Sequence, residues 1–456
     1  MKKTNAGNLT QGSISKSLMS FAVPVLLALF LQAMYGAVDL VIVGQFAGTC
    51  EQSAVASGSQ LFHMITMMVV GLTMGLTVLI GTAVGSHDSE RVCRGIGTGI
   101  LLFTATAVLI SAAVIPGSDV LCRWMKAPAE AFSQTSDYVR ICGWGTVFIV
   151  AYNVLGAVFR GLGDSRTPLV TVAIACVINI AGDLLLVGVL GMGAAGAAIA
   201  TDAAQAISVF ISLFLIAKRG LPFSFSGRLL RFDRASFAGI LLIGVPIALQ
   251  DVLVQFSFLF IQVIVNGMGV AQSAAVGVAE KVCGFLMLVA SAYLQSIAAF
   301  VAQNNGAGLF ERSRKALFYG MQTAFMAGLC TGAAAFFGGS FLAAFFSKDA
   351  AVIALAHDYM KAYAIDCLLT AFLFCFIGYF NGCGRTVFVM IQGILGAFLV
   401  RVPVVYLISR ISGATLFQIG LATPVSSAVQ ICLCLLAYRF YKESSRQAPA
   451  VSENHC

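Results

Sequence analysis

Three polar residues stand out within otherwise apolar stretches of the first half of the chain. Asp39 lies near the end of the apolar run 17–43, which contains no Lys or Arg. Asn179 and Asp183 lie in a second run, 167–190, and their spacing of four residues places them on one face of a helix. A carboxylate at membrane depth costs about 2.5–3.5 kcal/mol on insertion scales, so it needs a partner, water or a proton. Two such acids close together cannot both stay charged without a cation between them. These residues therefore predict a site for a proton or for Na⁺.

Membrane-spanning helices must position these residues. Of the 456 residues, 59% are hydrophobic and 10% are charged, and the mean hydropathy is +0.94. Soluble domains carry about 25% charged residues, so we expect an all-α integral membrane protein. Twelve apolar segments are long enough to cross a bilayer. They are 17–43, 53–84, 95–115, 137–160, 167–190, 195–217, 236–265, 273–303, 314–337, 357–381, 386–409 and 415–440.

The Lys and Arg residues orient these segments, because cytoplasmic loops carry an excess of positive charge. With a cytoplasmic N terminus, most basic residues fall on the cytoplasmic side, above all in the stretch 218–235. We therefore expect a multi-pass plasma-membrane protein with both termini in the cytoplasm. This distribution explains the net charge of +8 without a nucleic-acid partner. Lys281 and Arg401 alone remain at membrane depth, and we expect Arg401 near an outer helix end, where it snorkels or pairs with an acid.

The two halves of the chain repeat each other. Pro24 in SFAVP corresponds to Pro246 in LIGVP, 222 residues later, and the Gly-x-Gly ending at Gly163 recurs ending at Gly384. Each half has six predicted helices, so the repeats insert in the same orientation, as in transporters that rock two bundles around a central site. The expected parts are a cytoplasmic tail (1–15), an N-terminal six-helix lobe (16–217), a basic cytoplasmic linker (218–235), a C-terminal six-helix lobe (236–440) and a cytoplasmic tail (441–456).

Four stretches carry a family resemblance. They read FAVPVLLALFLQAMYGAVDLVIVG, YNVLGAVFRGLGDSRTP, INIAGDLLLVGVLGMGAAGAAIAT and, in the second half, VAQNNGAG. In this order and spacing they resemble the multidrug and toxic compound extrusion (MATE) family over residues 16–440. The resemblance implies two six-helix pseudo-symmetric lobes, a cation-coupled antiport cycle and the export of organic cations and drugs.

Within this family the DinF-like branch is the more similar one, and it implies a cation site inside the N-terminal lobe. The matching positions are Tyr35, Asp39, Asn153, Asn179, Asp183 and Thr201, with Pro24 as the residue that kinks the first helix. The NorM-like branch instead carries an acid eight residues after the proline of the seventh helix. Val254 occupies that position here, so we expect the coupling site in the N-terminal lobe.

Other polar residues at membrane depth have two interpretations: they line a substrate cavity, or they hydrogen-bond between helices and fix the packing. In the second half the cavity candidates are Asp251, Gln255, Gln262, Glu280 and Asp366. We expect Asp202 and Gln205 to make packing bonds only.

Catalytic motifs are missing from the chain. It contains no H-E-x-x-H and no G-x-S-x-G, and the G-x-G-x-x-G at 191–196 joins two predicted membrane helices instead of a strand and a helix. We therefore expect no enzymatic activity and no cofactor. The 13 Cys residues are scattered, as expected for small core residues.

The sequence thus favours a monomeric secondary active transporter that exports organic cations or drugs across the lipid bilayer in exchange for H⁺ or Na⁺ by alternating access. An alternative stays open: a lipid or lipid-linked oligosaccharide flippase of the same superfamily. A flippase needs basic residues in its cavity to hold phosphates. An acidic and aromatic cavity favours drug export, whereas a basic one favours lipid phosphates.

Overall fold

The computed structural model of the chain describes residues 9–219, 231–411 and 413–447, and those residues form helices and no strands. Twelve of their helical segments are long and apolar enough to cross a membrane, which confirms the twelve predicted spans. Most spans extend a few residues beyond the predicted ends, because the helices continue into polar sequence.

The helices of the first half are α1 (Ile14–Phe46), α2 (Thr49–Gly85), α3 (Ser89–Trp124), α4 (Phe132–Gly161), α5 (Arg166–Asp183) and α6 (Gly193–Arg219), with a 3-10 turn, η1 (Ala129–Ala131), before α4 and a π-helical turn, η2 (Leu184–Val189), after α5. The second half has α7 (Arg234–Asn266), α8 (Val270–Gly306), α9 (Phe310–Ala344) and α10 (Ala350–Gly382), then a span made of α11 (Thr386–Ile394), the π-helical η4 (Leu395–Arg401) and α12 (Val402–Ser409), and finally α13 (Leu416–Gly420) and α14 (Ala422–Gln447).

Helices α4 and α10 end in the same way, as expected of a duplication. Gly163 and Gly384 both have a left-handed backbone, with φ of 81° and 72°. The amide of the following residue closes each end, because Asp164 N–H donates to Phe159 O and Arg385 N–H donates to Phe380 O, both at 2.8 Å. A side chain with a Cβ rarely adopts this conformation, so the repeated glycines are needed to stop each helix.

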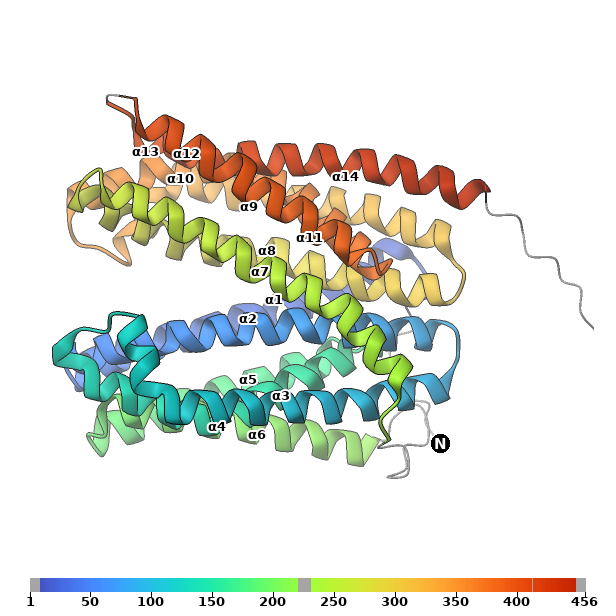
Figure 1. Cartoon of the computed structure of the whole chain (residues 1–456), viewed down its shortest axis with the longest axis horizontal. Helices are drawn as coiled ribbons and strands as arrows, with labels where there is room; N and C mark the ends of the chain where they lie inside the picture. The colour runs from blue at the N-terminus through green and yellow to red at the C-terminus, as the bar shows by residue number, and fades with distance from the viewer. Residues whose placement is uncertain (1–8, 220–230, 412, 448–456) are drawn as a thin grey trace, which may run out of the picture. The chain divides into compact units, whose positions relative to one another are not determined.

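The chain forms two compact units. Unit 1 comprises the chain up to Val252 together with Ser291–Gly320 and Gly378–Val389, and unit 2 comprises Leu253–Ala290, Met321–Ile377 and the chain from Met390. Unit 1 therefore contains the whole of α1–α6. Within it α4 packs against α2, α3 and α6, and α5 packs against both α1 and α6 (Figure 1). These contacts place α1, α5 and α6 next to one another, where the predicted cation site needs them.

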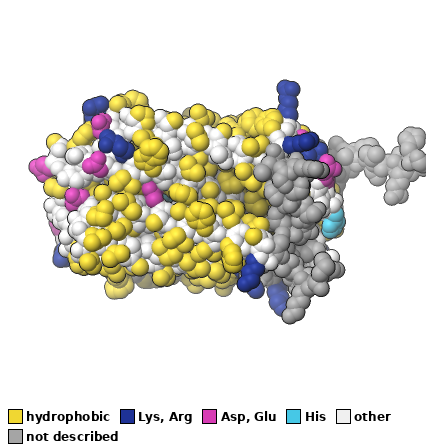
Figure 2. Space-filling model, turned by 90° about the horizontal axis from the view of Figure 1, so that it is seen from below, with side chains coloured by type: hydrophobic (Ala, Val, Ile, Leu, Met, Phe, Trp, Pro, Cys, Tyr) yellow, Lys and Arg dark blue, Asp and Glu magenta, His cyan; other side chains and the backbone are white. Residues whose placement is uncertain are grey.

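The outer surface is that of a membrane protein. Figure 2 shows a face on which hydrophobic side chains form a broad band, with Lys, Arg, Asp and Glu gathered mainly towards its two ends. Large apolar residues such as Leu109, Val177 and Phe210 are exposed in this structure. Exposure of that extent indicates contact with lipid.

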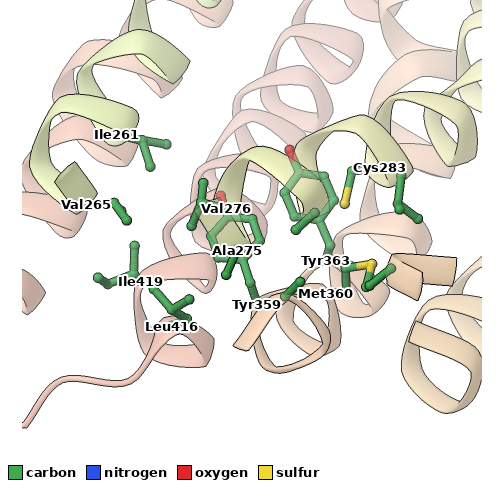
Figure 3. Packing of buried hydrophobic residues seen from close by; sticks show 14 of the residues in the cluster. Ile261, Val265, Ala275, Val276, Cys283, Tyr359, Met360, Tyr363, Leu416 and Ile419 are labelled. Atoms are coloured by element: carbon green, nitrogen blue, oxygen red, sulfur yellow. The ribbon is translucent and has the colours of Figure 1, made fainter. Parts of the chain in front are cut away.

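Unit 2 has its own apolar core. Ile261 and Val265 of α7, Val276 of α8, Tyr359 of α10 and Ile419 of α13 converge in it (Figure 3). All five are fully or almost fully buried. This core occupies the part of the C-terminal half that corresponds by repeat to the polar cluster of the N-terminal half.

Residues before α1 belong to the packed part of unit 1. Leu9 is buried, its N–H donates to Gln303 Oε1 at 3.3 Å and its carbonyl accepts from Asn304 Nδ2 at 3.2 Å. Arg312 donates to the carbonyls of Leu9 and Gly12 at 3.3 and 2.8 Å. The start of the chain is thereby held against the α8–α9 hairpin.

Helices α2 and α8 approach each other, within unit 1, so closely that neither backbone has room for a side chain. A Cβ atom on Gly85 would overlap the carbonyl of Gln303, and one on Gly306 would overlap the backbone of Thr82. Small residues permit such contacts between membrane helices.

We expect Gly306→Ala to destabilise the protein by about 1–3 kcal/mol, because two backbones must move apart to admit the methyl group. Gly277→Ala is the control in the same helix: nothing lies within 4 Å of its Cβ position. It should be neutral or slightly stabilising, since Ala favours helix more than Gly. Thermal unfolding in detergent compares the two variants, and equal midpoints would contradict the close contact.

Candidate functional site: a buried acid pair

The polar cluster of the N-terminal half is built by α1, α5 and α6. Asp39 of α1, Asn179 of α5 and Asp183 at the end of α5 are buried, and Thr201 of α6 is half-buried. Thr201 Oγ1 donates to Asp39 Oδ2 at 3.3 Å, and Asn179 Nδ2 donates to Thr201 Oγ1 at 3.4 Å. The carboxyl groups of Asp39 and Asp183 lie within hydrogen-bonding reach of each other. The structure therefore brings together the four residues from three separate helices.

Oxygen atoms outnumber donors in this cluster. Within the described part of the chain, no donor hydrogen-bonds to Asp39 Oδ1, Asn179 Oδ1 or either carboxylate oxygen of Asp183. Two ionised carboxylates have only acceptors, so they cannot bond to each other unless a proton lies between them. Buried oxygens without a donor are costly, and buried charges are normally paired or bound to a metal ion. Chemically, the cluster can hold a proton or a hard cation.

A π-helical turn begins directly after Asp183. In a π-helix each backbone N–H donates to the carbonyl five residues earlier, instead of four as in an α-helix. In η2, Leu190 N–H donates to Leu185 O at 2.9 Å. Such turns are rare and are often found at functional sites. The segment 167–190, predicted as one continuous helix, is therefore α-helical only as far as Asp183. Hydropathy cannot reveal this change, because it leaves the apolar pattern intact.

Tyr35 lies one turn before Asp39 on α1, and its hydroxyl accepts a hydrogen bond from Gln205 Nε2 at 2.9 Å. Gln205 thus forms a hydrogen bond between helices, as expected, and its partner is the tyrosine of the predicted site, which the spacing of a neutral amide does not reveal. Asp202, also on α6, fills the space left by Gly145, and none of the described residues donates to its Oδ1. It is a further acid, half-buried, that follows Thr201 directly in the sequence.

Asn153 of α4 is not part of this hydrogen-bonded cluster. Its Nδ2 donates to Ile149 O in its own helix at 2.8 Å. It borders a neighbouring cavity together with Gln32 of α1 and Tyr152.

Pro24 lies inside α1, as predicted, and removes a backbone donor from that helix.

A protein-family model matches both halves of this chain. The model for MatE matches it twice, over residues 24–185 and 246–407. The chain belongs to the MatE family. This confirms the resemblance seen in the sequence. The second match begins and ends 222 residues after the first, which is also the spacing between Pro24 and Pro246.

Curated relatives cover almost the whole MatE chain. It is 26% identical over 436 residues to "Probable multidrug resistance protein YpnP" of Bacillus subtilis (strain 168), covering 95% of this chain and 97% of that protein. It is 24% identical to "Probable multidrug resistance protein NorM" of Thermotoga maritima, covering 90% and 87% of the two chains.

Solved structures share the fold. One, described as "Outward-facing conformation of a multidrug resistance MATE family transporter of the MOP superfamily", has a TM-score of 0.92 at 21% identity and covers 98% of this chain and 100% of that one. Another, a MOP superfamily transporter from Pyrococcus furiosus described as having a binding pocket of reverse polarity, has a TM-score of 0.93 at 20% identity, with the same coverage. Both likenesses establish the MATE fold.

The MatE repeat identifies the counterparts of the acid cluster in the C-terminal half. A shift of 222 residues takes Asp39 to Ile261 and Asp183 to Val405, which are both buried in the apolar core of unit 2. The same shift takes Asn179 to Arg401. The C-terminal half thus has apolar residues in place of both acids and a cation in place of the amide.

Arg401 is buried, at 6% exposed surface, so the expectation that it snorkels at a helix end is wrong. Its Nη1 donates to Ser257 Oγ at 3.0 Å, and its guanidinium lies 4.5 Å from the ring centre of Phe258. It is within electrostatic reach of the buried Asp366, which accepts a hydrogen bond from Ser427 Oγ at 2.6 Å. None of the ion pairs among the described residues includes Arg401, so the predicted alternative, a pair with an acid of the C-terminal half, is not formed in this structure.

The remaining cavity candidates of the second half do not meet at one point. Gln262 Nε2 donates to Asn266 Oδ1 at 3.0 Å and to Ser273 Oγ at 3.1 Å, which ties α7 to α8. Asp251 and Glu280 are half-buried, and no donor among the described residues reaches Glu280 Oε1. Gln255 is half-buried on α7.

Proposed function

We propose that this MatE protein is a secondary active multidrug efflux transporter that exchanges organic cations for H⁺ or Na⁺, with the coupling cation held between Asp39 and Asp183. The observation that carries the proposal is the set of buried oxygens without donors on those two acids and Asn179. A proton or Na⁺ would satisfy them, and a cationic compound would compete for the same charge. The names of the curated relatives agree with drug export as the function.

Cation binding is coupled to drug movement through the charge of the acid pair and the position of α1. An empty pair carries two negative charges, which repel each other in a medium of low dielectric. A bound cation removes this repulsion and lets α1 draw towards α5 and α6, and the missing backbone bond at Pro24 lets α1 bend as it does so. This movement narrows the N-lobe cavity and expels the drug. A cation drives the cycle only through its different affinity for the two states.

The C-terminal half supports a single coupling site. Ile261 and Val405 offer no charge at the counterparts of the two acids. Arg401 lies within electrostatic reach of Asp366, and its positive charge would repel a second cation bound there. The C-terminal half therefore serves as the rigid partner in alternating access. The proposed transporter is a monomer in the plasma membrane, with both termini in the cytoplasm.

Dye efflux from proteoliposomes tests the proposal. Vesicles with purified protein and internal rhodamine 123, a lipophilic cation, receive an inward Na⁺ gradient, an inward proton gradient or neither. We expect one gradient to accelerate efflux and a matched ionophore to abolish the acceleration. If neither gradient moves the dye, the antiport proposal is wrong, and movement of a fluorescent phospholipid in the same vesicles would instead support the flippase.

A further inference from the structure

A short segment before α1 binds the second half of the chain. This segment, residues 9–12, is called the strap below; it lies in unit 1 together with the end of α8 and the start of α9. Arg312 of α9 donates to it through each of its guanidinium nitrogens. Nε reaches Leu9 O at 3.4 Å, Nη2 reaches Gln11 O at 2.9 Å and Nη1 reaches Gly12 O at 2.8 Å. Hydrogen bonds from a charged donor are stronger than neutral ones, so the strap is well anchored on α9.

The strap continues into α1 with almost no slack. Gly12 has a left-handed backbone, with φ of 76°, which turns the chain from the strap into the helix. Ser13 then precedes the first helical residue, Ile14, and its carbonyl accepts from Ser17 N–H at 2.9 Å. One residue between the strap and the helix leaves little room for independent movement. A displacement of the start of α1 therefore displaces the strap as well.

The first turns of α1 also contact α8 and α9, within unit 1. Tyr293 Oη of α8 donates to Met19 Sδ at 3.4 Å. Leu18 is fully buried, and a Cβ atom on Gly320 of α9 would lie 3.5 Å from its Cδ2. The part of α1 before Pro24 is thus attached to the second half of the chain.

The part of α1 after Pro24 is attached to the first half instead. Asp39 accepts a hydrogen bond from Thr201 of α6, and α1 packs against α5. Pro24 lies between the two attachments, and a helix bends most easily where a proline removes a backbone bond. A bend at Pro24 redirects the start of α1, and the strap carries that displacement to the α8–α9 hairpin.

The strap ends on the side chain that joins α8 to α4. Gln303 of α8 accepts from Leu9 N–H through Oε1 and donates through Nε2 to Gly161 O, the last residue of α4, at 2.8 Å. The backbone of Gln303 also touches that of Gly85 at the end of α2. Helices of the two halves are therefore closed against each other at this point, which we call the closure. Alternating access requires the closure to open once in each cycle.

We propose that the strap is a tether through which cation binding at Asp39 and Asp183 moves the closure, with Arg312 as the positioning residue that holds the tether. The inference rests on the proposed efflux function and specifies how the coupling site acts on the closure. A bound cation draws α1 towards α5 and α6, and the tethered α8–α9 hairpin follows. Without the tether, α1 still responds to the cation but the closure does not, so coupling is lost although the acid pair is intact.

Arg312→Met cuts the tether in the full chain. In proteoliposomes that contain rhodamine 123, we expect gradient-driven efflux to fall by about tenfold or more, the effect of losing hydrogen bonds from one charged group. Dye movement down its own concentration gradient should stay within about twofold of the wild type, because the acid pair and the dye pathway are unchanged. Arg314→Met is the matched control, since Arg314 lies in the same turn of α9 and pairs with Glu311 at 2.6 Å. It should leave both rates unchanged.

Inserting Gly-Ser-Gly-Ser between Gly12 and Ser13 separates a tether from a merely structural anchor. The insertion keeps every bond of Arg312 to the strap but adds a flexible linker, which cannot transmit a displacement. We expect it to reproduce the loss of coupling seen in Arg312→Met, and the combined variant should lose no more than either alone. Normal coupling with the insertion, or a further loss in the combined variant, would overturn the tether. Arg312→Lys keeps the charge without the fork and should show a smaller loss, which covers the case in which Arg312→Met does not fold.

Hydrogen–deuterium exchange of the purified protein tests the tether without transport. Asp39→Asn reproduces the uncharged acid, so at a fixed pH it should change amide exchange in residues 301–320 by about fivefold or more, a usual lower bound for coupling between linked sites. The change should vanish when the Gly-Ser-Gly-Ser insertion is added. Exchange in residues 301–320 that does not respond to Asp39→Asn would overturn the tether. If wild-type vesicles show no gradient-driven efflux, the efflux function is wrong, and the exchange result alone decides whether α1 and the closure are linked.

Discussion

Asp39→Asn is expected to lower gradient-driven rhodamine 123 efflux by about ten- to a hundredfold, the effect of losing one buried charged interaction. An amide cannot take up a proton, and it offers Na⁺ no negative charge. Asp183→Asn should behave in the same way, because its carboxylate faces that of Asp39. The measurement is the initial rate of dye efflux from proteoliposomes with and without the driving gradient.

Stability should change in the opposite direction from activity in these two variants. The amide has nearly the shape of the carboxylate but no charge to desolvate. Its NH₂ group also adds hydrogen-bond donors to a cluster in which several oxygens have none. We therefore expect thermal unfolding midpoints equal to or above that of the wild type. Loss of activity with retained stability is typical of a functional site that is costly to maintain.

Asp137→Asn is the control for this pair. Asp137 also lies in the N-terminal half, but it is exposed and forms a surface ion pair with Arg140 at 3.6 Å. Surface pairs of this kind contribute little, so efflux and coupling should remain. If Asp39→Asn still couples efflux to the gradient, the acid pair is not the coupling site.

Hydropathy and spacing were enough to predict the twelve helices and the common face of Asn179 and Asp183. Each is a local property, because a helix of apolar residues needs no distant partner to be stable in lipid. The match of Thr201 to the site came only from the family resemblance, since a threonine in a membrane helix is ordinary. Its bond to Asp39 depends on how α1 and α6 pack, and no spacing within either helix encodes that.

Features that depend on tertiary contacts could not be predicted. The π-helical turn after Asp183 leaves the apolar pattern of the segment unchanged. Gln205 carries no charge, so nothing marked it as the partner of Tyr35.

Arg401→Met is expected to destabilise the protein by about 1–3 kcal/mol, because it takes a hydrogen-bond donor away from the buried Ser257. It removes the hydrogen bond to Ser257, the contact with the ring of Phe258 and a positive charge within electrostatic reach of the buried Asp366. Asp366 then keeps its hydrogen bond from the hydroxyl of Ser427 but loses the favourable field of the arginine. Thermal unfolding in detergent should show a lowered midpoint.

The double variant Arg401→Met with Asp366→Asn separates electrostatics from packing. Removing both charges leaves no unpaired ion, so the double variant should be more stable than Arg401→Met alone, and the two effects should be clearly non-additive. Additive effects would show that the two residues do not interact. Efflux gives the second comparison: Asp366→Asn should keep its dependence on the gradient, whereas Asp39→Asn should lose it. A coupling defect in Asp366→Asn would place a second cation site in the C-terminal half, despite the positive charge of Arg401 within electrostatic reach, and would argue against a single site in the N-terminal half.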